Sequence, residues 1–154
     1  MEKLDKAMLE EVIRKVIAEQ FCGEKCPAIE KNQDMSGVTS IKLSTVKVDE
    51  EDRLDTGKPG DIVYTKDLFT LEESPRLGCG MMEMKETTFD WTLNYDEIDY
   101  VIEGHLDILI DGRKVSAKAG EIIFIPKGSS IQFSVPEFAR FMYVTYPADW
   151  ASQG

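Results

Sequence analysis

The amino-terminal 21 residues place apolar side chains at helical spacing. Leu4, Met8, Val12 and Val16 recur every four residues, and charged side chains occupy most of the opposite side. This period predicts an amphipathic helix over residues 1–21. A helix with one apolar stripe needs a surface that buries the stripe, and three are open here: its own domain, a dimer mate or another protein.

Between residues 22 and 40 the helical period disappears. Glycine, proline, asparagine, aspartate and serine are frequent there, and these residues interrupt regular structure. We therefore interpret residues 22–40 as a linker. Cys22 and Cys26 form the only close cysteine pair, and no second pair or nearby histidine completes a zinc site, so we expect two free thiols.

From residue 41 onward, apolar and polar positions alternate as they do in half-buried strands. Asp111-Gly112 is a strong hairpin signal, because both turn positions favour positive φ. Strands are predicted over residues 41–48, 62–65, 81–84, 97–103, 106–110, 122–125, 131–135 and 138–146. The acidic run over residues 49–52 is interpreted as a solvated loop. Many short strands without a second helix indicate an all-β antiparallel sandwich or barrel over residues 41–150.

Charge and composition exclude several classes of function. The chain of 154 residues has a net charge of −11, which argues against binding to nucleic acid or to an anionic membrane surface. No apolar run approaches the roughly 20 residues of a membrane-spanning helix, and the charged start does not resemble a secretory signal. Three cysteines are too few for a disulfide framework. We expect a soluble, cytoplasmic protein.

Two short segments together resemble the paired motifs of the cupin superfamily. Residues 97–104 (EIDYVIEG) contain a glutamate and a glycine separated by six residues, as at the end of the first cupin motif. Residues 120–128 (GEIIFIPKG) match the beginning of the second motif, and the interval between them holds one hairpin. The resemblance implies a cupin double-stranded β-helix, a jelly-roll barrel.

The metal site of typical cupins is absent from this sequence. The resemblance implies four ligands, three of them histidines, but only Glu97 is present, and Ile131 stands at the position of the third histidine. One carboxylate cannot hold a transition metal tightly. We therefore expect no tightly bound transition metal, and purified protein without stoichiometric iron, manganese, copper or zinc.

Two longer runs narrow the resemblance to one family. Residues 91–104 (WTLNYDEIDYVIEG) and residues 143–150 (YVTYPADW) are similar to the EutQ family of ethanolamine-utilisation proteins. The resemblance implies a place in or on a bacterial microcompartment and acetate kinase activity, which interconverts acetate and ATP with acetyl phosphate and ADP. It also favours residues 1–21 as an encapsulation peptide that docks on shell or cargo proteins.

The position of Glu97 in its motif predicts the contents of a pocket. If Glu97 points into the barrel, the strand period of two places Asp99 on the same side. Trp91 and Tyr95 share this parity if the extended conformation begins earlier. We predict Glu97, Asp99 and Tyr95 as catalytic residues, with Trp91 and Tyr95 binding substrate. For Trp91 and Tyr95, ordinary packing in the core is the alternative to a role in substrate binding.

Two classes of function are compatible with such a pocket. In an enzyme, Glu97 and Asp99 would hold Mg²⁺ transiently with ATP or ADP, because Mg²⁺ prefers oxygen ligands. Phosphoryl transfer also needs cations; Lys127 and Arg140 are the predicted substrate-binding cations, and Arg113 and Lys85 are further candidates. No phosphate-binding glycine loop occurs. Alternatively, the pocket binds a small ligand in a non-catalytic assembly factor. An open barrel edge favours a homodimer in either case.

Overall fold

The structure is a computed structural model and describes residues 28–153. The predicted helix over residues 1–21 lies outside the described residues. The chain divides into two compact units, one ending at Lys47 and the other beginning at Val48. The second unit contains the predicted pocket.

The described part of the first unit is a small hairpin. Strands β1 (Lys31–Gln33) and β2 (Thr39–Ile41) pair antiparallel, and a single 3₁₀ turn, η1 (Leu43–Thr45), follows. The predicted linker is therefore partly structured, and the predicted strand over residues 41–48 is wrong. Each of the two strands is three residues long and contains no buried residue, so they carry no apolar alternation that sequence reasoning could detect.

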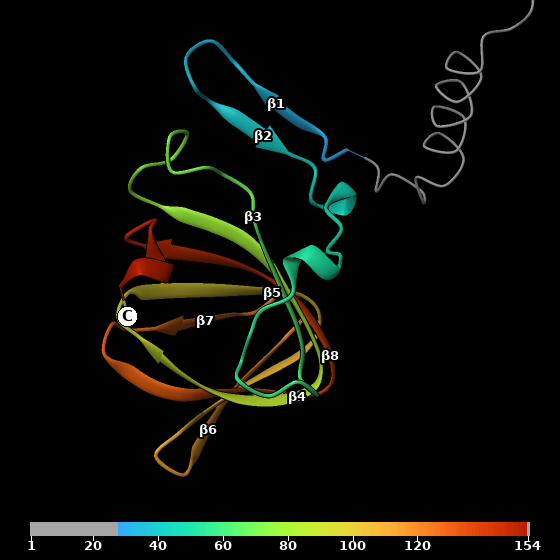
Figure 1. Ribbon diagram of the computed structural model, residues 1–154, viewed down its shortest axis with the longest axis vertical. Coiled ribbons are helices and arrows are strands. Elements are labelled where there is room, and N and C mark those ends of the chain that lie inside the picture. Colours follow the sequence, from blue (N-terminus) through green and yellow to red (C-terminus); the bar gives the residue numbers. More distant parts are fainter. Residues whose placement is uncertain (1–27, 154) are drawn as a thin grey trace, which may run out of the picture. The chain divides into compact units, whose positions relative to one another are not determined.

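Six strands build the second unit. Along the sheet the order is β3-β4-β8-β5-β6, and β7 pairs with β5. The strands are β3 (Ile62–Asp67), β4 (Gly78–Leu93), β5 (Asp96–Ile110), β6 (Arg113–Lys118), β7 (Ile122–Ile125) and β8 (Ser129–Tyr146). They curve around one interior, as Figure 1 shows. Two 3₁₀ turns accompany them, η2 (Glu50–Asp52) and η3 (Trp150–Ser152).

Predicted breaks between strands are bulges within longer strands. Strand β8 continues through Pro136, where it has two residues opposite the single Glu86 of β4. Proline fits this irregular position because it cannot donate to the ladder. Strand β5 continues through Gly104, which has a φ of +80°, and a Cβ there would collide with the carbonyl oxygen of Phe138. Both residues bend the strands and do not end them.

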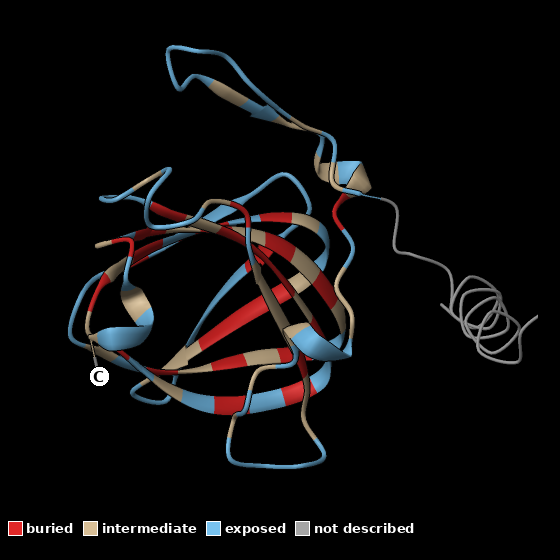
Figure 2. Ribbon diagram, turned by 45° about the horizontal axis from the view of Figure 1, so that its top comes forward, coloured by how far each residue is buried: buried red, intermediate tan, exposed pale blue. Residues whose placement is uncertain are grey.

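The core lies inside the curved sheet. Strands β4 and β8 alternate buried and exposed residues, and the large buried side chains Phe89, Phe133 and Phe141 stack in the interior. Figure 2 shows the buried residues along the inner faces of the strands. The predicted all-β class is confirmed. The acidic run predicted as a loop forms η2, where Asp52 pairs with Lys66 at 2.6 Å.

Candidate functional site

The predicted acids lie on the inner face of β5, where they meet β8. Glu97 is paired in register with Thr145, and Asp99 is paired with Tyr143. All four side chains are buried. Because residues at i and i+2 of a strand share a face, Glu97 and Asp99 are neighbours along the barrel interior, as the sequence predicts.

Two glycines of β4 make room for the residues opposite them. Gly78 is in register with Thr145, and Gly80 is in register with Tyr143. A Cβ at Gly78 would collide with the Thr145 hydroxyl, and one at Gly80 would collide with the Tyr143 ring. Close approach of side chains is thus the reason for glycine at both positions.

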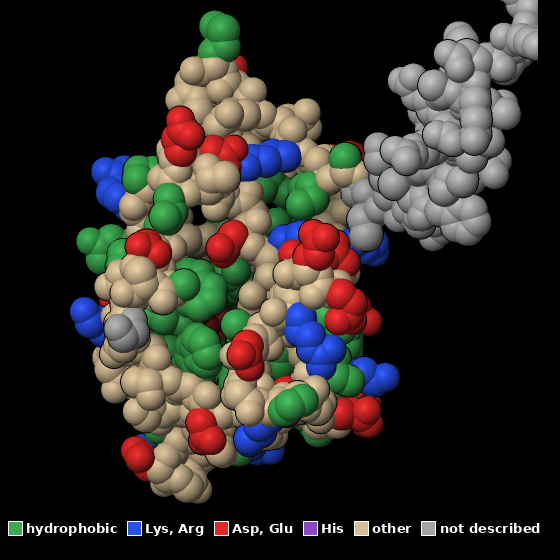
Figure 3. All heavy atoms as spheres, viewed as in Figure 1, with side chains coloured by type: hydrophobic (Ala, Val, Ile, Leu, Met, Phe, Trp, Pro, Cys, Tyr) green, Lys and Arg blue, Asp and Glu red, His purple; other side chains and the backbone are tan. Residues whose placement is uncertain are grey.

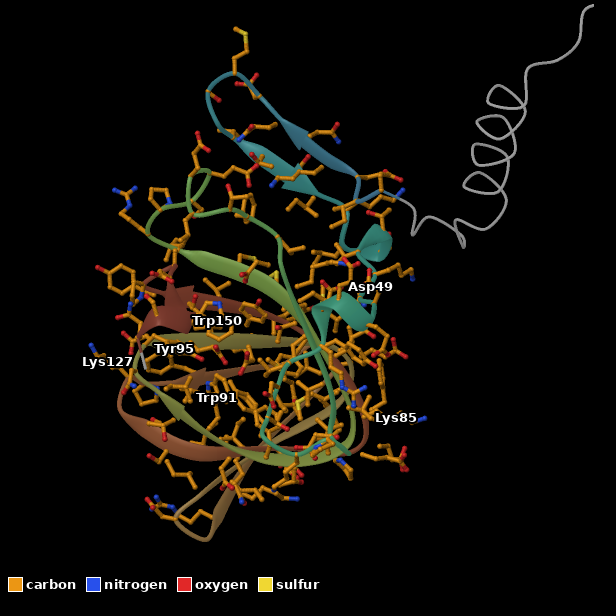
Figure 4. All side chains as sticks on the ribbon, in the orientation of Figure 1. Asp49, Lys85, Trp91, Tyr95, Lys127 and Trp150 are labelled. Carbon is orange, nitrogen blue, oxygen red and sulfur yellow. The ribbon has the colours of Figure 1, made fainter. Side chains whose placement is uncertain are left out.

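An aromatic cluster covers the acids. Trp150, from η3, has its ring centroid 5.9 Å from that of Tyr95, 6.2 Å from that of Tyr143 and 6.4 Å from that of Trp91. The Trp91 Nε1–H donates to the Tyr95 hydroxyl at 2.8 Å. Figure 4 shows Trp91, Tyr95 and Trp150 grouped at one end of the barrel. These contacts hold the three rings as one cover over the interior.

Two cavities lie on either side of this cover. The inner cavity has a volume of about 10 Å³, enough for about one water molecule. It is lined by Leu54, Met82, Phe89, Trp91, Tyr95, Glu97, Phe133, Tyr143 and Trp150. The outer hollow, with a volume of about 420 Å³, is large enough for a small-molecule ligand. Leu54 and the three rings of the cover line both cavities. Figure 3 shows hydrophobic side chains in a hollow on this face.

The buried acids are chemically unusual. Burial raises the pKa of Glu97 to about 7. Burial, and secondly the charge of Glu97, hold the pKa of Asp99 well above its ordinary value. Four buried oxygens lack a hydrogen-bond partner among the described residues: Glu97 Oε1, Asp99 Oδ1 and Oδ2, and Thr145 Oγ1. Near neutral pH the pair therefore retains a proton unless a cation or hydrogen-bond donor arrives.

A buried phenol extends the site toward β3. Tyr143 lines the inner cavity, and its hydroxyl donates to Asp67 Oδ1 at 2.7 Å. Burial and the nearby charge of Asp67 raise the pKa of Tyr143. The pKa of Tyr95 is also raised, by burial first and by the charge of Glu97 second. Both phenols therefore remain protonated over the physiological range.

The structure places the predicted residues unevenly. Trp91, Tyr95 and Glu97 meet at the inner cavity, and Asp99 lies on the same face of β5, one inward position further along the strand. The parity argument is confirmed for Glu97 and Asp99, whereas Trp91 belongs to β4 and Tyr95 to the bend before β5, so a shared strand is not what brings these two rings to the cavity. The residues that sequence reasoning missed are Trp150, Tyr143 and Thr145, together with the two glycines of β4. These residues reach the site through the register between paired strands, and no local pattern in the sequence reveals that register.

The predicted cations are not at the cavity. Arg140 forms an ion pair with Glu83, the residue of β4 that is opposite it in register. Arg140 therefore does not line either cavity. Arg113 pairs with Asp111 at 3.2 Å in the hairpin turn. Lys127 lies in an exposed turn near the cover, where its backbone N–H donates to Asp96 Oδ1 at 2.8 Å. Lys85 and Tyr95 lie on opposite sides of the barrel in Figure 4.

The unpartnered buried oxygens bear on which metal ion the pocket could hold. Two carboxylates and a hydroxyl are hard donors of the kind that Mg²⁺ accepts. Among residues 28–153 no group of three histidine, cysteine or acidic side chains is close enough to hold a metal ion. The predicted binding of Mg²⁺ by Glu97 and Asp99 thus stays a prediction that is chemically compatible with the donor set.

Comparison with known proteins establishes the family. The sequence matches the family described as "Ethanolamine utilisation protein EutQ" over residues 4–152. It is 74% identical over 151 residues to "Acetate kinase EutQ" of Clostridioides difficile (strain 630), a match that covers 97% of this chain and 96% of the relative. The chain belongs to the EutQ family. A relative of the same name from Salmonella typhimurium is 38% identical over 149 residues, and the match covers 95% of this chain and 63% of that protein.

Solved structures agree with this assignment. The Clostridium difficile EutQ structure superposes with a TM-score of 0.81 at 82% identity, covering 82% of this EutQ-family chain and 92% of that one. A cupin superfamily protein of Desulfitobacterium hafniense has a TM-score of 0.52 at 12% identity, over 68% of this chain and 85% of that one. The predicted cupin fold is confirmed. Within the described part of the chain, no helix is both long and apolar enough to cross a membrane.

Proposed function

We propose that this protein is an acetate kinase of ethanolamine utilisation, which interconverts acetate and ATP with acetyl phosphate and ADP. The observation that carries the proposal is its 74% identity, over nearly the whole chain, to a relative named for this activity. The buried pair of Glu97 and Asp99 supports it, because carboxylate oxygens without partners among the described residues, at and just beyond the inner cavity, can hold a cation beside a phosphoryl group.

The chemistry assigns a role to each group of residues. Phosphoryl transfer needs positioning and charge neutralisation and no protein nucleophile, and bound Mg²⁺ supplies part of that neutralisation. Glu97 and Asp99 would hold the ion, with the Thr145 hydroxyl as a further oxygen. The rings of Trp91 and Trp150 would exclude water from the acids. Exclusion of water strengthens electrostatic interactions at the transferred group.

The sizes of the two cavities separate the parts of the substrate. A nucleotide is far too large for the inner cavity of about 10 Å³, whereas the outer hollow of about 420 Å³ has the size of an ordinary ligand site. The nucleotide would therefore occupy the outer hollow. Lys127, at the exposed turn near the cover, is the predicted cation with the best placement to reach its phosphates.

The decisive experiment is a kinase assay of protein made in a host without acetate kinases of its own. With Mg²⁺, acetyl phosphate and ADP, the protein should form ATP. Glu97→Gln keeps the shape and removes one carboxylate, so it should lower kcat about 100-fold or more. Glu137→Gln, at an exposed position of β8, is the matched control and should keep full activity. Full activity of both Glu97→Gln and Asp99→Asn would place the active site elsewhere.

A second function is favoured by the charge of the cavities. Among the described residues that line them, none is a lysine or an arginine, although phosphoryl transfer depends on cations. The alternative is a non-catalytic protein that binds a small ligand or assists assembly of the microcompartment. Wild-type protein that binds a small molecule but forms no ATP would establish this alternative.

We also infer a location in or on a bacterial microcompartment, with residues 1–21 docking on shell or cargo proteins. The support is the helical spacing of apolar residues in that segment and the membership of the EutQ family. Removal of residues 1–27 should abolish co-localisation with shell proteins in cells. The melting temperature of the barrel should stay within a few degrees. A truncated chain that fails to fold would show that the segment belongs to the core.

A further inference from the structure

The two cavities combine acidic and aromatic groups without a compensating cation. Glu97 lines the inner cavity, Asp90 lines the outer hollow, and the rings of Trp91, Tyr95 and Trp150 lie between the two. No lysine or arginine of the described chain lines either space. Aromatic faces and carboxylates both attract cations, and carboxylates repel anions. The site therefore has the composition of a cation-binding pocket.

The buried oxygens require hydrogen-bond donors. Glu97 Oε1, both carboxylate oxygens of Asp99 and Thr145 Oγ1 are buried and have no hydrogen-bond partner within residues 28–153. Glu97 and Thr145 are opposite each other in register, with both side chains on the inner face. A primary ammonium group carries three N–H donors and no acceptor. In the inner cavity its donors would meet the carboxylate of Glu97, which lines that cavity, whereas a carboxylate or phosphate anion would add further acceptors.

The size of the inner cavity favours an ammonium group over a hydrated metal ion. The inner cavity holds about one group of the size of water. An ammonium group has this size and can give up its water to carboxylates and aromatic faces. Mg²⁺ loses its hydration shell reluctantly and usually retains several waters, so at Glu97 those waters would extend beyond the inner cavity, whereas an ammonium group needs none. A short alkyl chain on the ammonium would extend among the rings that separate the two cavities.

We propose that this cavity binds a small primary alkylammonium ion, with its ammonium group against Glu97 and its alkyl part among Trp91, Tyr95 and Trp150. Ethanolamine is the appropriate probe, because it belongs to this chemical class and appears in the description of the family. This binding does not require kinase activity. In a protein that is also a kinase, the amine competes with the cation at Glu97 and lowers the rate.

Intrinsic fluorescence reports on this cavity directly, because both tryptophans of the chain line it. Ethanolamine titrated into the full-length protein, with Mg²⁺ and nucleotide absent, should give a saturable change in tryptophan emission. Calorimetry should give the same dissociation constant, in the millimolar range or tighter. Ethylamine should also bind. Ethylene glycol, which replaces the ammonium by a neutral hydroxyl, and acetate should produce no saturable change. Equal binding of ethylene glycol would overturn the proposal.

Variants test the charge and the rings separately. Glu97→Gln should weaken ethanolamine binding about tenfold or more, since it removes a charged acceptor. Glu137→Gln, which removes an exposed carboxylate, should bind ethanolamine like the wild type. Trp91→Phe leaves Trp150 as the single reporter and should weaken binding by a smaller factor. Unchanged binding by Glu97→Gln would show that the amine occupies another site. If Glu97→Gln does not fold, unchanged affinity of Trp91→Phe for ethanolamine would lead to the same conclusion.

The outcomes distinguish this proposal from the kinase proposal. Saturable ethanolamine binding by a protein that forms no ATP would support the ammonium site and overturn the kinase alone. ATP formation without ethanolamine binding would support the kinase and overturn the ammonium site alone. Ethanolamine binding together with competitive inhibition of ATP formation would place the ammonium site and the kinase site both at Glu97. In each case calorimetry and fluorescence read binding without reference to catalysis.

Discussion

Strand β5 carries opposite chemistry on its two faces between residues 96 and 101. Toward the barrel interior it places Glu97 and Asp99, which are 5% and 0% exposed. On the outer face it places Ile98 and Tyr100, which are 43% and 39% exposed. Folded proteins usually bury apolar residues and expose charged ones. Strand β5 instead buries two acids on its inner face and exposes two apolar residues on its outer face.

The two reversals differ in what would relieve them. On the inner face, buried acids without hydrogen-bond partners are relieved by a cation, a proton or a donor group. On the outer face, Ile98 is opposite Phe124 of β7, Tyr100 is opposite Ile122, and Tyr146 of β8 continues the surface. Removal of this surface from water relieves it. Relief of the inner face thus requires a proton or a small cationic or donor group, and relief of the outer face requires contact with another apolar surface.

A second copy of this chain is the occupant that we infer for the outer face, in agreement with the predicted homodimer. Copies with a net charge of −11 repel each other, so contact is least unfavourable through a surface whose side chains are uncharged. Ile98, Tyr100, Ile122 and Phe124 form such a surface across β5 and β7. A two-fold axis would bury the surface of both copies at once.

The largest expected effect is the loss of this dimer. The double variant Ile98→Asp with Phe124→Asp places four charges in the interface of a dimer, at a cost of several kcal/mol per pair of copies. Light scattering should give a dimer for the wild type and a monomer for the variant. Val115→Asp changes an exposed apolar residue of β6 outside this face and should remain dimeric. A monomeric wild type at micromolar concentration would contradict the inference.

The next effect concerns the inner face and pH. The folded chain holds the pKa of Glu97 at about 7, above the ordinary 4.5, so it keeps a proton that the unfolded chain releases. The Glu97 contribution should therefore lower stability as pH rises from about 4.5 to about 7, and the raised pKa of Asp99 acts in the same direction. Glu97→Gln removes up to about 3 kcal/mol of this loss, so it should raise the free energy of unfolding at pH 8.

Urea denaturation of wild type and Glu97→Gln at pH 4 and pH 8 checks this prediction. The two proteins should differ little at pH 4, where Glu97 is protonated in both the folded and unfolded chains. Glu137→Gln serves again as the exposed control and should follow the wild type at both values. A variant that is less stable than the wild type at pH 8 would mean that a cation already compensates Glu97.

A smaller effect is expected at Thr145. Its hydroxyl is buried without a partner in the part of the chain that the structure describes, so Thr145→Val replaces an unsatisfied polar group by a methyl group of similar shape. The free energy of unfolding should rise by about 1 kcal/mol. Thr87→Val is the contrasting variant, because the Thr87 hydroxyl accepts a hydrogen bond from the Ile62 N–H at 2.9 Å. Loss of this hydrogen bond should lower the free energy of unfolding. Thermal unfolding compares the two, and destabilisation by both would show that Thr145 has a partner.

Sequence alone determined most strands of the barrel and the shared face of the two acids, but not the hairpin before residue 48. Alternation depends only on the period of the extended backbone, so residues 97, 99 and 101 of β5 share a face in any register. Residues 122–125 coincide with β7 for the same reason. The breaks predicted near Gly104 and Pro136 became bulges, because the pairing of neighbouring strands continues on both sides of each irregularity.

The tertiary structure decided which distant residues complete the site. Trp150 covers the acids because η3 follows β8 to the same end of the barrel, and Thr145 faces Glu97 because of the register between β5 and β8. The register between β4 and β8 likewise pairs Arg140 with Glu83, so the charge of Arg140 is neutralised outside the cavity. Local sequence specifies the period of a strand, but pairing between strands specifies neighbours. The chemistry of this pocket depends on neighbours that lie up to 76 residues apart along the chain, as Asp67 and Tyr143 do.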